Sequence, residues 1–303
     1  MRARLRQIEQ PVRHGVLPFG VAAIDRALPG GGLALGAVHE FLGADADEED
    51  STAPAAFTAA LLARLDCNLV SSPALPGKST PSPPAGRGER GKSGAAPPSC
   101  RRPCGTEPSA IYSPPPASSG TGTVLWCLSR PDLYGPGLAE YGLAPARLVL
   151  VAGRRDEDIL WAMEEGLRAG ASSGLAAVVG EIESLPMVAS RRLQLAAERT
   201  GIPAFMLRRW HTGTAAAKER GRPSAAATRW RIAAMPARAL PGEPGIGRPR
   251  WRVELLRCRG GGTGSWEVEA PDATGLVSLP AELADRPAPL REGAAGQPRR
   301  RAG

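Results

Sequence analysis

One segment of the sequence has the residue types and spacing of a phosphate-binding loop. Residues 86–93 read Gly-Arg-Gly-Glu-Arg-Gly-Lys-Ser, which satisfies the pattern G-x-x-x-x-G-K-[ST]. In a working loop, backbone N–H groups and the lysine hold the phosphates, and a strand and a helix on either side position them. Residues 94–98 read Gly-Ala-Ala-Pro-Pro, which does not start a helix. We therefore interpret the match as an accident of composition, with nucleotide binding by Lys92 as an alternative.

The segment around this match has the composition of an unstructured insertion. Residues 71–120 contain 12 Pro, 10 Ser and 7 Gly and show almost no apolar periodicity. Such a segment cannot bury enough apolar surface to offset the conformational entropy that it loses on ordering. We expect residues 71–122 to be a disordered insertion within a folded domain.

Residues that commonly bind metals or form disulfides are few and scattered. The chain has five cysteines and three histidines, and the spacing of Cys100 and Cys104 does not match half of a zinc site. We expect free thiols, no metal site and no cofactor. We interpret His39, which belongs to an apolar strand pattern, as a structural histidine.

The net charge of +8, from 38 basic and 30 acidic residues, is concentrated in two segments. Residues 71–122 carry +4, and residues 201–270 hold 13 basic but only 5 acidic side chains. Aromatic and basic residues adjoin in the second segment, a pattern that can stack bases and neutralise phosphates of single-stranded DNA. The alternative, which the two-residue period of a strand favours, is that Trp230 and Trp251 point into the core and only Trp210 is exposed. The candidate DNA-binding residues are Arg208, Arg209, Trp210, Arg229, Arg231, Arg250 and Arg252.

The elements that must position these residues follow from the apolar pattern. Continuous apolar runs that alternate with helical patterns are typical of a parallel sheet covered on both faces. The expected fold class is α/β, with a mostly parallel sheet flanked by helices and a C-terminal antiparallel extension. Strands are expected at 36–42, 123–129, 147–152, 175–180, 203–207, 228–233, 251–257 and 266–269, and helices at 52–65, 137–141, 156–169 and 187–199. The last two strands should form a hairpin around the glycine-rich turn at 260–264.

The pattern predicts one folded domain that the insertion interrupts. No run approaches the roughly 18 apolar residues of a membrane span, and the start lacks the apolar stretch of a signal peptide, which favours a cytoplasmic protein. The expected parts are an N-terminal segment at 1–13, a core at 14–70 and 123–206, the insertion at 71–122, a basic β-rich extension at 207–285 and a disordered tail at 286–303.

The order of several motifs resembles that of RecA-like proteins, and more closely that of the ImuA family of accessory proteins in damage-inducible mutagenesis. Residues 17–43 resemble the segment that leads into the RecA nucleotide loop, with its Gly-Gly-Leu turn and following strand. The resemblance implies a RecA-like core over about residues 14–206 without the insertion, and more loosely over 228–280. Further similar segments are the strand and loop at 125–134, the entry to the next strand at 142–148, and the Trp-Arg strands near 230 and 251.

At the junction where a RecA-like protein has its phosphate loop, this sequence is acidic. The resemblance places the glycine-lysine-threonine of the family on residues 48–50, which are Glu-Glu-Asp, its catalytic glutamate near Ser129 and its magnesium-associated aspartate on Gly180. We therefore expect repulsion of triphosphate and no enzyme activity. Glu181, one residue further on, we interpret as a solvent-facing or capping acid. The degenerate nucleotide loop comprises Gly43, Asp45, Asp47, Glu48, Glu49, Asp50, Ser51 and Thr52.

The resemblance implies a non-catalytic accessory protein of SOS-induced, error-prone translesion synthesis that works by contact. The implied partners are an ImuB-type inactive Y-family polymerase, a DnaE-type polymerase and the RecA filament, with single-stranded DNA as a further candidate and no membrane. Two alternatives stay open. One is a RecA-like ATPase or single-strand-binding protein of recombination and repair, and the other is a cell-division inhibitor of the SulA type, for which 303 residues is large.

Overall fold

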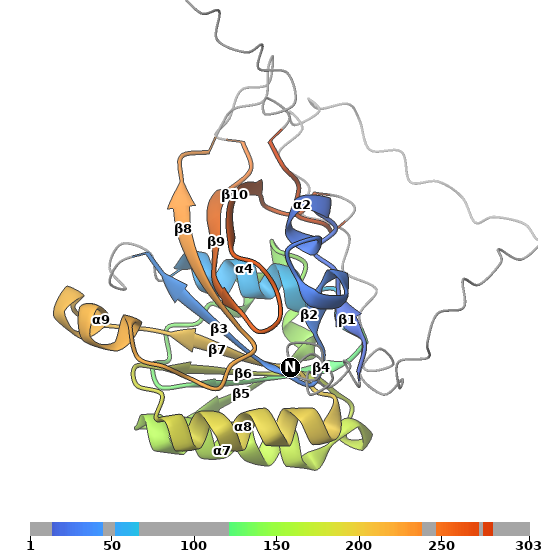
Figure 1. The fold of residues 1–303 in the computed structure, drawn as a ribbon. Coiled ribbons are helices and arrows are strands. Elements are labelled where there is room, and N and C mark those ends of the chain that lie inside the picture. Colours follow the sequence, from blue (N-terminus) through green and yellow to red (C-terminus); the bar gives the residue numbers. More distant parts are fainter. Residues whose placement is uncertain (1–13, 45–51, 67–120, 238–246, 273–274, 281–303) are drawn as a thin grey trace, which may run out of the picture.

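Most strands of the protein form one twisted sheet, shown in Figure 1. The computed structural model describes residues 14–44, 52–66, 121–237, 247–272 and 275–280. The strands of the sheet are β3 (Val38–Gly43), β4 (Thr123–Leu128), β5 (Leu148–Ala152), β6 (Leu175–Ile182), β7 (Ala204–Arg208), β8 (Thr228–Met235), β9 (Arg250–Cys258) and β10 (Gly264–Glu269). Their order is β10-β9-β8-β3-β7-β6-β4-β5. Strands β3 to β8 pair in parallel, whereas β9 and β10 are antiparallel to their neighbours.

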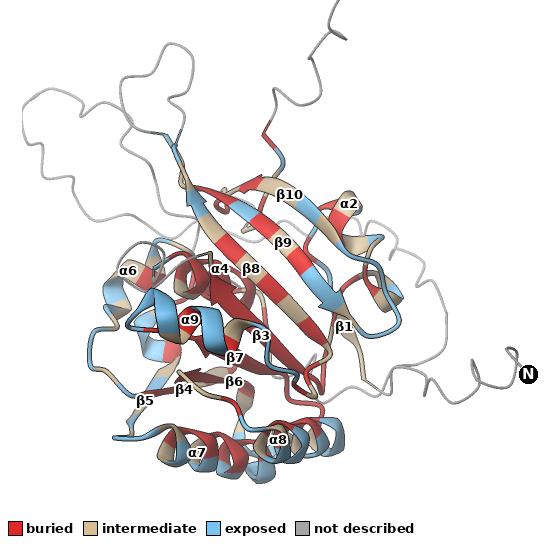
Figure 2. Cartoon of the chain, turned by 60° about the vertical axis from the view of Figure 1, so that its left-hand side comes forward, coloured by how far each residue is buried: buried red, intermediate tan, exposed pale blue. Residues whose placement is uncertain are grey.

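Helices cover both faces of the parallel part of the sheet. Helix α4 (Thr52–Leu62) lies on one face, and α7 (Asp156–Ala169) and α8 (Met187–Thr200) lie side by side on the other (Figure 1). Helix α4 is almost entirely buried because it packs against β3, β7 and β8. Helices α7 and α8 bury only the stripe that faces the sheet (Figure 2). The short elements are β1 (Val16–Leu17) paired with β2 (Leu33–Ala34), α2 (Ala22–Asp25), α6 (Gly135–Ala139) and α9 (Gly213–Arg220).

The sheet separates two apolar clusters, and alternate residues of β4 and β7 belong to opposite ones. On the α4 face the Phe41 ring lies 6.4 Å from that of Trp230 and 5.9 Å from that of Phe205, measured between centroids. On the α7–α8 face, Met206 of β7 belongs to the same cluster as Met163 of α7. Because side chains alternate along a strand, a polar residue at a strand end can be assigned to one face from its neighbours.

The C-terminal strands continue the sheet beyond the helices and leave one face open. Trp251, Val253 and Leu255 of β9 are buried on the α4 face, whereas Arg252 and Leu256 are exposed (Figure 2). The interpretation that the strand tryptophans point into the core is confirmed, since both Trp230 and Trp251 are buried.

His39 is the structural histidine that its apolar surroundings predict. Its Nε2 lies 2.9 Å from the carbonyl oxygen of Ala34, which can only accept, so Nε2 carries the proton. Its Nδ1 accepts from the hydroxyl of Thr228 at 2.7 Å, and that hydroxyl accepts from Trp230 Nε1 at 2.8 Å. Burial lowers the pKa of His39 to about 4. The ring is therefore neutral and both nitrogens are satisfied.

One arginine joins the two points at which the chain leaves and re-enters the described domain. Arg147 donates from Nη1 and Nη2 to the carbonyl oxygens of Ala63 and Leu65, at 3.0 and 2.7 Å, and from Nε to that of Gly122 at 2.8 Å. Beside it, the hydroxyl of Thr121 donates to Asp66 Oδ1 at 2.8 Å. Residues 66 and 121 are therefore neighbours in space.

The predicted fold class is confirmed: a mostly parallel sheet is flanked by helices and ends in antiparallel strands. The hairpin around 260–264 is confirmed by the pairing of β9 with β10. Helix α9 was not predicted, because its residues are only small or charged and show no apolar period. The N-terminal segment at 1–13, the phosphate-loop match with Lys92 and the tail at 286–303 lie outside the described residues, as does the insertion up to residue 120.

Candidate functional site at the carboxyl end of the sheet

The junction at which the sequence predicts a degenerate phosphate loop lies at the carboxyl end of the parallel strands. Strand β3 ends at Gly43, which is paired with Ile232 of β8, and α4 begins at the exposed Thr52. Ligands of open parallel sheets bind at this edge, where the chain reverses its direction of winding. The remaining loop residues, Asp45, Asp47, Glu48, Glu49, Asp50 and Ser51, lie outside the described residues.

Four polar side chains meet at this edge, and we call Trp126, Asp132, Glu181 and Arg209 the edge cluster. Glu181 of β6 is 1% exposed and accepts from Trp126 Nε1 and from Arg209 Nη1, each at 2.7 Å. Arg209, which follows β7, also donates to both carboxylate oxygens of Asp132, at 2.9 and 2.8 Å. This bidentate pairing is the strong geometry of an arginine with a carboxylate. One guanidinium thus serves two carboxylates, and the edge cluster has a net charge of −1.

The expectation that Glu181 faces solvent or caps a helix is wrong. Glu181 has the same parity along β6 as Val179, which packs on the α4 face. Gly180 faces the other side, where a Cβ atom would lie 2.1 Å from the sulfur of Met163. An acid at position 180 would therefore point away from α4 and would have no room. Glu181 is the carboxylate that β6 presents on the side of the junction, two strand spacings or roughly 10 Å from β3.

The hydrogen bonds to Arg209 determine the ionisation of Asp132. They hold the pKa of the Asp132 carboxyl below its usual value, against a smaller opposing effect of burial. Asp132 therefore keeps its negative charge well below neutral pH.

A second group of charges lies on the opposite face of the sheet, and we call Glu40, Arg208, Glu219 and Arg229 the buried charge cluster. Glu40 of β3 is fully buried and forms an ion pair with Arg229, which lies directly opposite on β8. Its Oε1 is 3.7 Å from Arg208 Nη1 on β7. Glu219 of α9 lies on the other side of Arg208, with 3.3 Å between Oε2 and Nη2. Two arginines and two glutamates leave no net charge.

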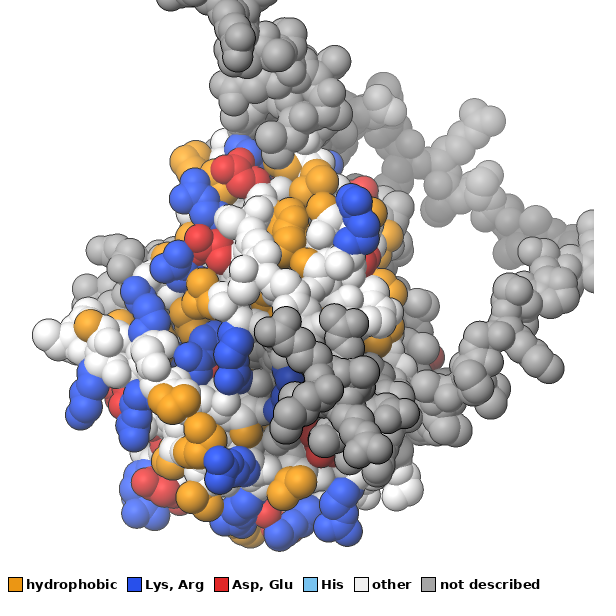
Figure 3. Space-filling view, viewed as in Figure 1, with side chains coloured by type: hydrophobic (Ala, Val, Ile, Leu, Met, Phe, Trp, Pro, Cys, Tyr) orange, Lys and Arg blue, Asp and Glu red, His pale blue; other side chains and the backbone are white. Residues whose placement is uncertain are grey.

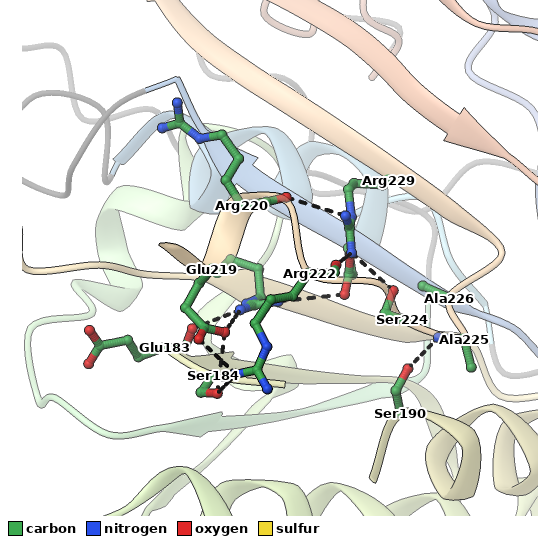
Figure 4. A network of polar contacts seen from close by, with 12 residues as sticks. Glu183, Ser184, Ser190, Glu219, Arg220, Arg222, Ser224, Ala225, Ala226 and Arg229 are labelled. Atoms are coloured by element: carbon green, nitrogen blue, oxygen red, sulfur yellow. Dashed lines mark hydrogen bonds and ion pairs between the residues drawn. The ribbon is translucent and has the colours of Figure 1, made fainter. Parts of the chain in front are cut away.

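The residues around the buried charge cluster attach α9 and the segment after it to the sheet (Figure 4). Arg222 Nη1 donates to Glu219 Oε1 at 2.8 Å, and Arg229 Nη2 donates to Ser224 Oγ at 3.2 Å. Burial lowers the pKa of Arg208, with Glu40 and Glu219 acting in the opposite direction. Burial would raise the pKa of Glu219, but Arg222 and Arg208 hold it below its usual value. The cluster is thus an ionic cross-link between α9 and three strands.

The expectation that Trp210 is exposed is wrong. It is 1% exposed and lies beneath α9 with Leu42 and Ala216. Its Nε1 donates to the carbonyl oxygen of Glu183 at 3.0 Å, and the guanidinium of Arg208 lies 5.5 Å from its ring centroid. The physical reason is α9, which folds back over the end of β7 and which the sequence pattern did not indicate. A base cannot stack on Trp210 in this structure.

The other candidate DNA-binding arginines are matched to carboxylates. Arg231 forms an ion pair with Glu254, directly opposite on β9, while Arg250 and Arg252 lie 3.1 and 3.8 Å from Glu267 of β10. Arg252, 52% exposed, is the most accessible of the six arginines, since the side chains of Arg208, Arg209, Arg229, Arg231 and Arg250 are all largely covered. DNA binding by this set stays a prediction, but the structure does not gather it into one accessible surface.

One residue of these clusters, Glu40, could have been found from the sequence, whereas Asp132 could not. Glu40 is a charge inside the apolar run 36–42, and an acid in a buried strand requires a buried partner. Asp132 lies in a loop that has no local pattern, and only the fold brings it to Arg209.

In the described part of the chain, no group of three or more His, Cys, Asp or Glu is placed to hold a metal ion. No helix among the described residues is long and apolar enough to span a membrane.

Comparison with known proteins identifies the family. No family model matches the chain. The chain is 36% identical over 260 residues to Protein ImuA of Caulobacter vibrioides, in strains NA1000 and ATCC 19089, which covers 85% of this chain and 84% of the relative. Among solved structures, that of the RadB recombinase has a TM-score of 0.44 and 13% identity and covers 85% of this chain and 97% of that one. Because 36% identity extends over most of both chains, the chain belongs to the ImuA family.

Proposed function

We propose that this protein is a non-catalytic accessory factor of damage-induced, error-prone DNA synthesis that acts through contacts with other proteins. Its membership of the ImuA family supports the pathway. The proposed partners are an inactive Y-family polymerase of the ImuB type and a polymerase of the DnaE type. The observation that carries the non-catalytic part is the edge cluster, in which Arg209 is already bound to Glu181 and Asp132.

The charge at the carboxyl edge opposes nucleotide binding. A triphosphate needs cations and free N–H donors at this edge, as in phosphate loops. Both terminal nitrogens of Arg209 donate to carboxylates, and five acids between residues 45 and 50 adjoin the same edge in sequence. One carboxylate about 4 Å from a phosphate charge costs roughly 4 kcal/mol at an effective dielectric of about 20. That corresponds to roughly a thousandfold loss of affinity.

The proposal is tested by separating induced mutagenesis from nucleotide binding. Deletion of the gene should lower the frequency of damage-induced mutations, and the wild-type chain should restore it. Thr52→Ala at the start of α4 and Lys92→Ala in the phosphate-loop match should restore it equally, because neither side chain is expected to hold a nucleotide. Isothermal titration of the full chain with magnesium-ATP at millimolar concentration should show no binding.

Leu61→Asp, which places a charge in the buried face of α4, serves as the control for loss of the fold. If Thr52→Ala or Lys92→Ala removes both ATP binding and induced mutagenesis, the protein is a nucleotide-dependent enzyme and the proposal is wrong. If deletion of the gene leaves induced mutagenesis unchanged, the assignment to this pathway is wrong.

A further inference from the structure

The outer surface of α7 and α8 carries large apolar side chains that face water. Trp161 of α7 is 64% exposed, and Val188 and Leu195 of α8 are 70% and 59% exposed. Single exposed apolar residues are common on protein surfaces, so their arrangement decides whether they matter. In Figure 3, hydrophobic and basic side chains, with some acidic ones, lie beside one another over the lower part of the molecule, where α7 and α8 lie.

The three side chains share one face of the helix pair. Val188 and Leu195 are seven residues apart, so they lie two turns apart on one stripe of α8. Both helices lead from one parallel strand to the next, so they run in the same direction. Trp161 and Val188 each lie about one turn before a member of the interhelical ion pair of Glu164 with Arg192, 2.5 Å apart. Trp161 and Val188 are therefore at the same level along the helix pair.

The unmatched charge around these apolar side chains is positive. Arg191 and Arg199 are exposed and lie one turn on either side of Leu195, and neither forms an ion pair with a described residue. Acidic side chains of α7 form ion pairs with arginines of α7 and α8. Glu164 and Glu165 lie 2.6 and 2.9 Å from Arg168, and Glu164 also holds Arg192, whereas the exposed Glu157 has no described ion pair.

We propose that the outer face of α7 and α8 docks an amphipathic helix of a partner protein. The apolar stripe of that helix covers Trp161, Val188 and Leu195, and its acidic residues pair with Arg191 and Arg199. The inference rests on the proposed function, in which the protein acts through contacts with other proteins. Proteins that bind an amphipathic helix contact it through apolar side chains spaced over about two helical turns. Tryptophan and arginine often contribute most of the binding energy at such interfaces.

The charge on the face favours this occupant over two others. A second copy of the chain, docked through the same face, would offer Arg191 and Arg199 only Glu157 as an acid without a described ion pair, so most of the unmatched positive charge would stay unmatched. A nucleic acid strand would use the arginines but would leave Val188 and Leu195 exposed or covered by phosphates. An acidic helix with one apolar stripe satisfies both the arginines and the apolar side chains.

The test places a photo-cross-linker in the full chain. Benzoylphenylalanine replaces Trp161 in one variant and Leu195 in another, and cells that carry each variant are treated with a DNA-damaging agent and irradiated. We expect both positions to cross-link to one protein and mass spectrometry to place the cross-link in a segment with apolar residues at helical spacing and flanking acids. Tyr134, an exposed aromatic residue at the carboxyl edge of the sheet, is the matched control position, which should not cross-link to that segment.

The charge on the face is tested separately by reversal. Arg191→Glu with Arg199→Glu should lower the yield of the cross-link at Trp161 at least tenfold, and acid-to-lysine changes in the identified segment should restore it. Arg154→Glu with Lys218→Glu makes the same change in net charge at exposed positions elsewhere and should leave the yield unchanged. Circular dichroism checks that each variant is folded.

Several outcomes would overturn the inference. They are a cross-link to nucleic acid, to lipid or to a second copy of the chain, no cross-link at either position, and a yield that charge reversal does not change.

The two proposals fail in different ways. If gene deletion lowers induced mutagenesis but the Arg191→Glu, Arg199→Glu variant restores it fully, the proposed function stands and the docking face is wrong. If deletion has no effect on mutagenesis, the proposed function fails, and cross-linking still decides what the face binds.

Discussion

Glu40 and Glu181 are buried carboxylates in the parallel strands β3 and β6. Arg229 of the neighbouring strand β8 holds Glu40, and Arg209, which follows β7, holds Glu181. Removing one partner of such a buried pair costs about 3–5 kcal/mol, because the other charge is left without compensation. Arg209 cannot leave Glu181 to bind a phosphate without that cost. At the scale of single residues, the edge cluster is therefore more stable with Arg209 bound to its own carboxylates than with Arg209 bound to a ligand.

His39 makes the stability of the protein depend on pH. Its pKa is about 4 in the folded chain and returns to the ordinary value of 6.5 on unfolding. Between these values the unfolded chain binds more protons, so the free energy of unfolding falls as the pH falls from 6.5 toward 4. The loss amounts to at most about 3 kcal/mol, at 1.36 kcal/mol for each pKa unit. Urea denaturation at intervals between pH 7.5 and 5 should show the start of this decline.

His39→Gln is the control, because glutamine keeps hydrogen-bonding groups near Ala34 and Thr228 but does not titrate. We expect the variant to be less stable at pH 7.5 and to have a flatter pH dependence between pH 6.5 and 5. Equal slopes in the two proteins would show that His39 takes up its proton in the folded state.

At the scale of elements, the core is built from pieces that the insertion separates in sequence. Arg147 connects the end of α4 with the start of β4 through three carbonyl oxygens. The hydrogen bond between Asp66 and Thr121 lies beside these contacts. The packing of α4 on the sheet therefore requires that these two points be close, and a short turn could connect them.

We expect that replacing residues 67–120 with a turn of three or four residues leaves the fold intact and changes the melting temperature by only a few degrees. Arg147→Met, in contrast, should lower the free energy of unfolding by about 2–4 kcal/mol, because buried carbonyl groups lose a charged donor. Thermal unfolding followed by circular dichroism measures both effects.

Arg147→Met should be equally destabilising in the shortened chain, since its acceptors are all retained there. A shortened chain that does not fold would mean that residues 67–120 contribute to the domain. Arg155→Met provides a matched exposed control, which should change the free energy of unfolding by less than about 1 kcal/mol.

Patterns of apolar residues predicted the strands and longer helices, because strands buried on both faces appear as continuous apolar runs and helices such as α7 and α8, which bury one stripe, show a helical apolar period. Helix α9 left no such trace, and with it the cover over Trp210 and Arg208 could not be predicted. The resemblance to RecA-like proteins placed the magnesium-associated aspartate of the family at Gly180. Only the alternation of side chains in the folded strand β6 shows that the neighbouring Glu181 is the residue that faces α4. Asp132 reaches Arg209 through tertiary structure alone.

At the scale of the whole molecule, part of the positive charge of residues 201–270 is neutralised within the sheet. Arg229, Arg231 and Arg250 have carboxylate partners on neighbouring strands, and Arg209 is paired across the edge of the sheet. Paired charges produce a weak field at a distance, and salt screens exposed charges beyond about 8–10 Å. We therefore expect the C-terminal strands to attract nucleic acid less than their composition indicates.

Arg231→Ala combined with Arg252→Ala should change the affinity for a thirty-nucleotide oligothymidylate by less than about twofold. Glu254→Gln combined with Glu267→Gln frees the same arginines and should strengthen binding and steepen its salt dependence, by about 0.7 in log-log slope for each phosphate newly contacted. Fluorescence anisotropy at several salt concentrations measures both. A shallower slope in the double alanine variant would mean that DNA displaces the carboxylates from these arginines.

The position of β3 in the sheet has a consequence for the synthesis of the protein. Val38 pairs with Ala204, and His39 pairs with Thr228, so both neighbours of this early strand are made more than 160 residues later. At about 5–20 residues per second, β3 waits roughly 10–40 s on the ribosome with Phe41 and Leu42 uncovered. The nascent chain thus exposes an unpaired apolar strand until the last third of the chain is made. The yield of folded protein would then depend on chaperones that bind this strand during synthesis.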